Sequence, residues 1–267
     1  MEPASSLESI NKLACTVAAL WGGSTVKVIF EFGSRYGEDS IEFAKKYPQA
    51  TVYAFECNTN TLAECRKNIS AYKNIILTEK AISDVNGTVS FYKIDKEKTE
   101  TTWADGNQGA SSLLKASGKY PVENYVQEEI KVDSITLSSF INANHIDTVD
   151  ILWMDIQGAE LLALKGLGDD IAKVKLMHLE VEFFEIYTNQ PLFDEISAFL
   201  NDAGFELLGF SSQSNYSGDA IFVNKQQVPS AKLAQYKKSL VPKSPGIISR
   251  GLNKLKRITK KLFNAGR

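Results

Sequence analysis

Short apolar runs alternate with amphipathic stretches along the first third of the chain. The runs are rich in β-branched and aromatic residues, as strands are, and the stretches between them have the residue spacing of helices. The expected strands are TVKVIFEF, ATVYAFE and NIILTEKAI, and the expected helices are EDSIEFAKKY and TNTLAECRKNISAY. This β-α-β-α-β order predicts an α/β fold in which helices cover both faces of a parallel sheet. A leading helix is expected over residues 5–21, and Thr59 or Asn60 is the expected N-cap of the helix after the second strand.

The pattern is interrupted in the middle of the chain and then resumes. Residues 95–127 are polar and rich in turn formers, which predicts a long functional loop. Strands are expected at GTVSFYKI, EEIKVDSI, VDILWMD and KVKLMHLEVEF, and helices at TLSSFINANH, AELLALKGL and LFDEISAFLNDAG. The last two runs, FELLGF and GDAIFVN, are joined by only a few residues, so we expect them to form an antiparallel hairpin.

The composition is that of an ordinary globular protein, with 43% apolar and 23% charged residues among 267. The three cysteines have no metal-site spacing, which favours a reduced intracellular compartment and no metal. The N-terminus is acidic where a signal peptide would be basic, and the apolar stretch LACTVAALW is too short to span a bilayer. We therefore expect a cytoplasmic protein.

Charge is distributed unevenly along the chain. Residues 225–267 contain 12 Lys and Arg and no Asp or Glu, whereas residues 1–224 have a net charge of −14. The expected division is a helical lead at 1–24, a main domain at 25–225 and a basic tail at 226–267. An acidic main domain also argues against a nucleic-acid partner.

The end of the tail has the pattern of an amphipathic helix. On a helix at about 100° per residue, the large apolar residues of 247–263 fall within an arc of about 160°, and all the basic residues lie opposite. A wholly basic polar face predicts peripheral contact with an anionic membrane on its cytoplasmic face. The competing interpretation is a helix that docks on the acidic surface of the same protein.

Three carboxylates lie at the carboxyl ends of three expected strands, at Glu31, Glu56 and Asp155. Each alone could be a helix cap or a solvated loop charge, but an open parallel sheet binds its ligands at the carboxyl ends of its strands. Glu31 ends an apolar run, so it needs a cationic partner or several hydroxyl and N–H donors. The glycines of the turn FGSRYG, Gly33 and Gly37, allow the backbone to approach a ligand closely.

The position of Glu56, 23 residues after Gly33, suits a carboxylate that accepts hydrogen bonds from a ribose. A dinucleotide favours a Gly-x-Gly-x-x-Gly turn, and Glu31 would repel its phosphates. S-adenosylmethionine has no phosphate and carries a sulfonium and an ammonium, which an acid at the first strand end suits. An oxidoreductase that uses NAD on a similar sheet remains the alternative.

From about Val26 to Asn224 the chain resembles the FkbM family of class I, Rossmann-like methyltransferases that use S-adenosylmethionine. The resemblance rests on six segments in order: FEFGSRYGEDS, VYAFECN, TEKAISDVNGTVSFY, GASSLL, VDILWMDIQGAELLALKGL and HLEVEF. It implies a doubly wound, mostly parallel seven-stranded sheet whose last strand is antiparallel. The implied cofactor contacts are Glu31, Gly33, Ser34, Tyr36, Gly37, Glu56, Cys57, Ala81, Ile82 and Ser112; for the serines of GASSLL an ordinary turn is an equal alternative.

Members of this family methylate mainly hydroxyls, often on sugars or macrolides, so the resemblance implies an O-methyltransferase acting on a glycan or another polyhydroxylated small molecule. A hydroxyl acceptor benefits from a general base, and Asp155 is the first candidate. Weaker candidates are Glu160, Glu182 and His178, the last being more typical of a core histidine. Gln157 stands where the family usually has a glutamate, which leaves a catalytically inactive, membrane-recruited module as a further alternative.

Overall fold

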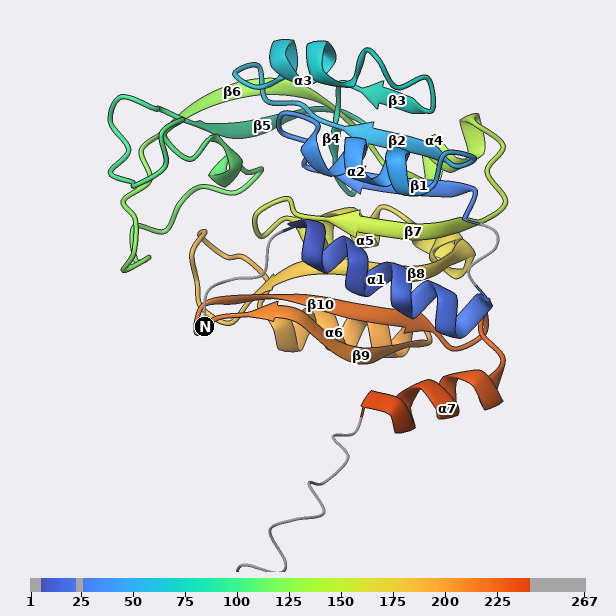
Figure 1. The fold of residues 1–267 in the computed structure, drawn as a ribbon. Coiled ribbons are helices and arrows are strands. Elements are labelled where there is room, and N and C mark those ends of the chain that lie inside the picture. Colours follow the sequence, from blue (N-terminus) through green and yellow to red (C-terminus); the bar gives the residue numbers. More distant parts are fainter. Residues whose placement is uncertain (1–5, 23–25, 241–267) are drawn as a thin grey trace, which may run out of the picture.

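The computed structural model describes residues 6–22 and 26–240. A seven-stranded sheet runs through the middle of the molecule, in the order β3-β2-β1-β7-β8-β10-β9 (Figure 1). Neighbouring strands are parallel except at β10, which is antiparallel to both β8 and β9. The expected α/β fold with a terminal antiparallel hairpin is therefore confirmed. The strands are β1 (Val28–Phe32), β2 (Thr51–Phe55), β3 (Ile75–Thr78), β7 (Val149–Met154), β8 (Val174–Glu182), β9 (Phe205–Gln213) and β10 (Ser217–Asn224).

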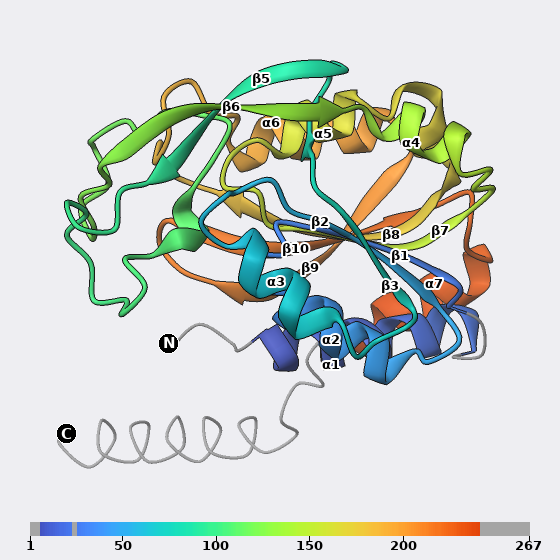
Figure 2. The same ribbon diagram turned by 90° about the horizontal axis from the view of Figure 1, so that it is seen from above.

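Helices cover both faces of this sheet (Figure 2). One face carries α1 (Ser6–Trp21), α2 (Glu38–Lys46), α3 (Leu62–Ile69) and α7 (Ser230–Leu240), and the other carries α4 (Leu137–Ala143), α5 (Glu160–Lys165) and α6 (Phe193–Asp202). The expected N-cap of α3 was wrong, because the helix begins at Leu62 and its N-cap position is Thr61. Asn58 occupies the preceding turn instead, and its side chain accepts a hydrogen bond from the backbone N–H of Asn60 at 3.0 Å.

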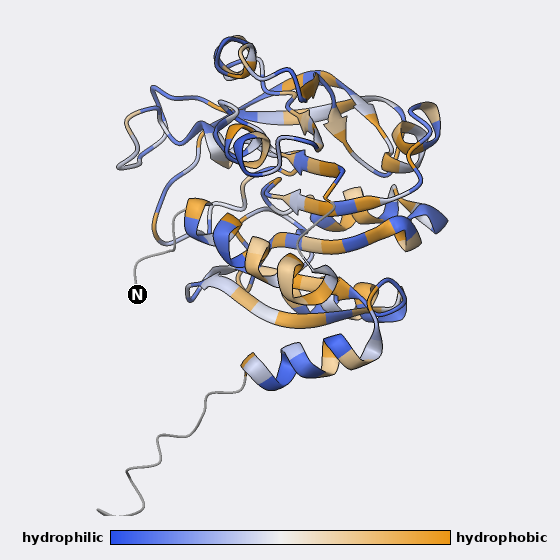
Figure 3. Cartoon of the chain, turned by 45° about the vertical axis from the view of Figure 1, so that its right-hand side comes forward, coloured by the Kyte–Doolittle hydropathy of each residue, from blue (hydrophilic) through white to orange (hydrophobic). Residues whose placement is uncertain are grey.

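The two faces of the sheet are packed by alternate residues of each strand, as the pleat requires. Phe30 and Phe32 of β1 belong to the core under α4, α5 and α6, whereas Ile29 belongs to the core under α1 and α2. Apolar residues are accordingly concentrated in the central strands and on the inner sides of the helices (Figure 3). The same alternation turns Glu31 toward α2, where Ser40 donates a hydrogen bond to it at 2.6 Å.

A second, three-stranded sheet was not expected from the sequence. It has the order β4-β6-β5 and consists of β4 (Ala81–Ile82), β5 (Gly87–Ile94) and β6 (Gln127–Ile135). The single strand expected over residues 74–82 is therefore wrong, because β3 ends at Thr78 and β4 joins a different sheet. The loop between β5 and β6 contains a short 3-10 helix, η1 (Gln108–Ala110), and extends past the carboxyl ends of the central strands (Figures 1 and 2). A further 3-10 helix, η2 (Gly168–Lys173), leads into β8.

The first part of the basic tail packs against the main domain. Leu233 of α7 is buried in the same core as α1, and the hydroxyls of Tyr236 and Thr16 lie 2.8 Å apart. The amphipathic helix expected at residues 247–263 lies outside the described residues, and the domain division stays a prediction. Among residues 6–22 and 26–240, no helix has the length and apolar character needed to cross a bilayer.

Candidate active site

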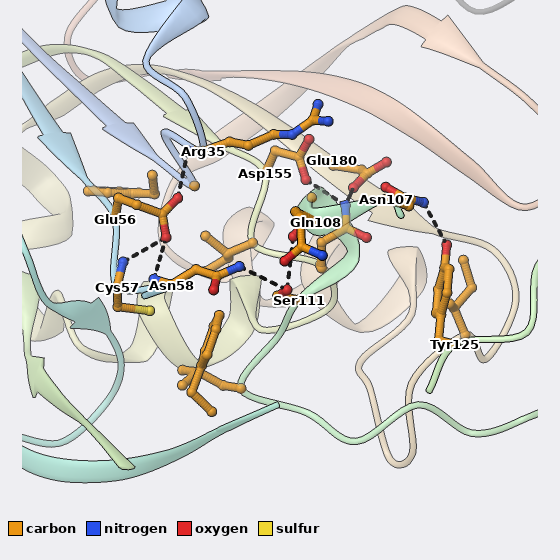
Figure 4. Close-up of a pocket in the computed structure, with 18 of the residues that line it drawn as sticks. Arg35, Glu56, Cys57, Asn58, Asn107, Gln108, Ser111, Tyr125, Asp155 and Glu180 are labelled. Carbon is orange, nitrogen blue, oxygen red and sulfur yellow. Dashed lines mark hydrogen bonds between the residues drawn. The ribbon is translucent and has the colours of Figure 1, made fainter. Parts of the chain in front are cut away.

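A cavity of about 490 Å³ opens at the carboxyl ends of β1, β2, β7 and β8, where the sequence places its three carboxylates (Figure 4). The β5–β6 loop, β4 and the turn between β9 and β10 form the remaining walls. Of the expected site residues, the cavity is lined by Gly33, Glu56, Cys57, Ala81, Ile82 and Asp155. The others, Glu31, Ser34, Tyr36, Gly37 and Ser112, lie around it without lining it, and their roles stay predictions.

The two glycines of the first turn, Gly33 and Gly37, are required for different structural reasons. Gly33 has a φ of +85°, and a Cβ there would lie 2.0 Å from the carbonyl oxygen of Asp155, so only glycine allows the ends of β1 and β7 to come this close. Gly37 has a φ of +86°, and a Cβ there would lie 2.6 Å from the side chain of Ile69. Gly33 therefore shapes the cavity, whereas Gly37 allows α2 to pack against α3.

Glu31 lies beneath the turn rather than in the cavity wall. Its carboxyl group accepts hydrogen bonds from the hydroxyls of Ser34 and Ser40, so the partners are hydroxyls and not a cation. Burial, and to a smaller extent the neighbouring Asp39, raise the pKa of Glu31 to about 8. Glu31 therefore holds the turn against α2 and supports the cavity from below.

Glu56 lies at the end of β2 and connects the turns that follow β1 and β2. Its Oε2 accepts a hydrogen bond from the backbone N–H of Arg35 at 2.6 Å, and its Oε1 accepts from the N–H groups of Cys57 and Asn58 at 2.8 and 2.6 Å. Burial raises the pKa of Glu56 to about 7, although these donors act in the opposite direction. The carboxylate is thus fixed at the cavity wall by three backbone donors.

The wall beside Glu56 is apolar and firmly anchored. Ala81, Ile82 and Phe91 form it, and each is less than a tenth exposed. Ser111 closes it by accepting hydrogen bonds from Asn58 Nδ2 and from the N–H of Ile94, both at 3.0 Å. A flat aromatic group fits such a wall because its faces need no polar partners.

Ser112, the second serine of GASSLL, points away from this wall. Its hydroxyl donates to the carbonyl oxygen of Gln157 at 2.8 Å and so connects the β5–β6 loop to the turn after β7.

Asp155 is held in place by Gln157, the residue found where a glutamate was expected. Gln157 Nε2 donates to Asp155 Oδ1 at 2.7 Å and to Glu180 Oε2 at 2.5 Å. The hydroxyl of Tyr187 lies 2.9 Å from Gln157 Oε1, which fixes the orientation of the amide. Gln157 has a φ of +57°, an uncommon conformation for a residue with a side chain. The two N–H groups of the amide can bridge two carboxylates, whereas a third acid has no donor when ionised and only one when protonated.

Further carboxylates surround this bridge. Burial raises the pKa of Glu180 and of Glu182 well above the ordinary value, and neighbouring carboxylates, Asp155 among them, add to the shift. Glu160 of α5 is fully buried, and its pKa rises to about 8. Asp219, which pairs with Glu180 across β8 and β10, has its pKa raised to about 7 by burial and by Asp155. The end of the cavity at β8 is therefore strongly acidic.

The β5–β6 loop closes over the cavity through contacts with the first turn. The guanidinium of Arg35 forms an ion pair with Asp105, whose carboxylate also accepts a hydrogen bond from the Tyr36 hydroxyl at 3.0 Å. The same guanidinium lies 5.4 Å from the ring centre of Trp103 and 4.9 Å from that of Tyr36. The loop is thus attached to the turn whose backbone binds Glu56.

Two other candidates from the sequence have clear structural environments. His178 is a core residue, as expected: it is 2% exposed, stacks on Trp153 at 3.7 Å between ring centres, and burial lowers its pKa to about 3. Glu182 lines the cavity. Sequence reasoning missed Glu180, although a pair of acids two residues apart in an apolar strand was a visible signal, because such residues share one face.

Comparison with known proteins gives a family match and several relatives. A family model described as the methyltransferase FkbM domain matches residues 31–207. The 2-O-methyltransferase NoeI of Sinorhizobium fredii is 27% identical over 165 residues, which are 61% of this chain and 66% of that protein. Methyltransferase 1 of Beauveria bassiana is 25% identical over 53% of this chain and 59% of its own length. The chain thus spans less than two thirds of the length of each of these relatives.

Solved structures show weaker similarity. The structure of a methyltransferase FkbM from Methylobacillus flagellatus superposes with a TM-score of 0.47 at 12% identity, covering 77% of this chain and 47% of that one. A TrmK from M. capricolum, in complex with S-adenosylhomocysteine, has a TM-score of 0.45 at 13% identity and covers 97% of this chain and 86% of its own.

Proposed function

Because this chain belongs to the FkbM family of S-adenosylmethionine-dependent methyltransferases, we propose that it methylates a hydroxyl of a glycan or another polyhydroxylated small molecule. The observation that carries the proposal is a single cavity with a fixed carboxylate, Glu56, at one end and Asp155 with Glu180 at the other. The name of the relative NoeI, a 2-O-methyltransferase, supports transfer to oxygen. Family membership does not support the NAD-dependent alternative, and nothing in the site favours an inactive module.

The described residues fit the cofactor. A ribose presents two hydroxyl donors to Glu56, the apolar wall of Ala81 and Ile82 suits an adenine, and the exposed backbone at Gly33 leaves room for the methionine part. Cys57 lines the wall between Glu56 and the apolar side. Ser34, Tyr36 and Gly37 support this arrangement from the turn rather than by lining the cavity.

When bound, S-adenosylmethionine supplies a methyl group that is already activated for transfer, so positioning accounts for most of the chemistry. We assign to Asp155 the removal of the proton from the acceptor hydroxyl. Gln157 orients the Asp155 carboxylate for this role by donating to Oδ1. The contact between Arg35 and Asp105 holds the β5–β6 loop beside the cavity.

The proposal is tested by ligand-dependent thermal stability. S-adenosylhomocysteine should raise the melting temperature, with a shift that grows with the logarithm of its concentration above Kd, whereas NAD should leave it unchanged. Stabilisation by NAD alone would contradict the family assignment of the cofactor. Incubation with deuterated S-adenosylmethionine and a library of glycosides, read by mass, should then show a labelled methyl on an acceptor oxygen.

We further propose peripheral attachment through residues 247–263 to an anionic cytoplasmic membrane face, close to a lipid-linked acceptor. The basis is the sequence pattern alone, since these residues lie outside the described ranges. Liposome flotation of the full chain should be compared with a chain that ends at Leu240, which keeps the contact of α7 with α1. Flotation only of the full chain is expected with anionic vesicles at low salt; two proteins that both stay in solution would favour docking on the protein itself.

A further inference from the structure

The acidic end of the cavity contains no ion pair between residues that the structure describes. Asp155, Glu180 and Glu182 line it, and within residues 6–22 and 26–240 no Lys or Arg forms a salt bridge with any of them. The cationic side chains in the cavity wall are Arg35, which is paired with Asp105, and Lys80, which lies next to β4. Clustered carboxylates without a counter-charge destabilise one another, so this end of the cavity is complementary to a positive charge.

Glu182 adds an unpartnered acceptor to this wall. The residue is 1% exposed, and its Oε2 has no hydrogen-bond partner among the residues that the structure describes. A buried carboxyl oxygen without a hydrogen-bond partner costs free energy that a ligand donor would recover. Because Glu182 lines the cavity, this buried acceptor adds to the negative charge of the wall.

Tyrosine rings stand beside these carboxylates. Tyr120 of the β5–β6 loop and Tyr216 of the β9–β10 turn both line the cavity, and their rings meet edge to face with centres 5.6 Å apart. Tyr125 lies 5.8 Å from Tyr120 and extends the same wall. Carboxylates combined with tyrosine faces are the groups that bind an ammonium ion, through charge and through cation–π attraction. The same rings also suit the apolar faces of a sugar.

The ribose end of the cofactor lies away from this charge at β8. Glu56, the proposed ribose partner, follows β2, and Glu182 ends β8, three strands away in the order β2-β1-β7-β8. At a strand spacing of about 4.8 Å, this separation is roughly 14 Å. Asp155 at the end of β7 faces the point between the two ends, where transfer would occur. The carboxylates of β8 therefore belong to the acceptor.

We propose that the β8 end of the cavity binds a protonated amine of the acceptor, so that the acceptor is an amino sugar or another polyol that carries a free amine. This inference rests on the proposed function, and it narrows the acceptor from polyols in general to basic polyols. Glu180 and Glu182 bind the ammonium, Tyr120 and Tyr216 cover it, and Asp155 faces the hydroxyl to be methylated.

The test measures binding of three sugars that differ in charge. Saturation-transfer NMR of the full chain with S-adenosylhomocysteine is recorded with D-glucosamine, D-glucose and N-acetyl-D-glucosamine at neutral pH. Glucosamine should bind roughly tenfold more tightly than either neutral sugar, a ratio that corresponds to about 1.4 kcal/mol. The preference should disappear in Glu182→Gln and persist in Glu195→Gln, which removes an exposed carboxylate of α6.

The outcomes separate the two proposals. Equal affinity for the three sugars, or no binding of glucosamine, overturns the amine inference while binding of S-adenosylhomocysteine leaves the proposed function in place. Failure of S-adenosylhomocysteine to bind would overturn the proposed function itself. Should Glu182→Gln not fold, Glu180→Gln replaces it, and the comparison of the three sugars on the unaltered chain decides in any case.

Discussion

At the scale of a single residue, Glu56 is both a structural anchor of the cavity wall and the proposed partner of the cofactor ribose. Its carboxylate accepts three backbone hydrogen bonds and lines the cavity. We expect Glu56→Ala to weaken binding of S-adenosylmethionine by roughly 1–3 kcal/mol, the scale for hydroxyls that lose a charged acceptor. Calorimetry measures the change, with Glu64→Ala on the exposed side of α3 as the matched loss of a carboxylate. Unchanged affinity in a folded Glu56→Ala protein would remove Glu56 from the site.

Asp155 should affect turnover more than binding. We expect Asp155→Asn to lower turnover by about 10²-fold or more, because an amide cannot accept the acceptor's proton as a base does, and to leave cofactor affinity nearly intact. Initial rates and calorimetry on the same protein separate the two effects. Asp147→Asn, an exposed acid just before β7, is the control. Turnover that survives in Asp155→Asn would mean that positioning alone suffices.

Individual residues also show where sequence reasoning ends. The strand-end rule located Glu56 and Asp155 at the cavity, because the carboxyl ends of parallel strands meet at one edge. The rule could not tell that the pleat turns Glu31 toward α2, away from the cavity. Nor could it show that Gln157 bridges Asp155 and Glu180. That contact depends on a left-handed backbone conformation at Gln157, which the spacing of residues along the chain does not predict.

At the scale of an element, the attachment of the β5–β6 loop to the rest of the protein can be tested. Its attachment to the first turn depends on Asp105, which pairs with Arg35 and accepts from Tyr36. We expect Asp105→Asn to increase cleavage of this loop by limited proteolysis about fivefold, the factor for a loss of about 1 kcal/mol from a partly exposed pair. Glu97→Gln changes an exposed acid of the same loop and should leave the cleavage rate unchanged. Equal rates in both variants would show that the pair does not hold the loop.

Strands and helices with a strong periodic pattern were predictable from the sequence, but the strands that pair with one another were less so. The run at residues 149–155 and the terminal hairpin appear as β7, β9 and β10 because their lengths and apolar content leave few alternatives. The run at 74–82 divides into β3 and β4 because Glu79 and Lys80 carry the chain from one sheet to another. Periodicity states that a segment is extended, but it does not state which strand lies beside it. The helix α7 was not predicted, because the basic residues of this part of the tail obscure the spacing of its apolar residues.

The whole molecule should respond to pH through its buried carboxyl groups. Burial raises the pKa of Glu31 from 4.5 to about 8, so the folded state holds a proton that the unfolded state releases. This contribution to the free energy of unfolding is complete below pH 4.5 and is lost as the pH rises through about 8. The unliganded protein should therefore be less stable at pH 8 than at pH 6, by about 2 kcal/mol from this group alone.

Urea unfolding of the wild-type protein and of Glu31→Gln at the two pH values checks this expectation. The variant should lose less stability between pH 6 and pH 8 than the wild type, because its amide does not titrate. Glu195→Gln, with an exposed side chain, should behave as the wild type does. A wild-type protein that gains stability over this interval would contradict the sign of the effect.

The place of β10 between β8 and β9 affects how the protein is made. The ribosome completes β8 at Glu182, but the strand that pairs with its free edge ends at Asn224, 42 residues later. At about 5–20 residues per second, that edge stays unpaired for about 2 to 8 seconds, plus the time needed to clear the exit tunnel. An apolar strand with an open edge is a template for pairing with another chain. Nascent chains of this protein should therefore depend on chaperones until the last strand has been inserted.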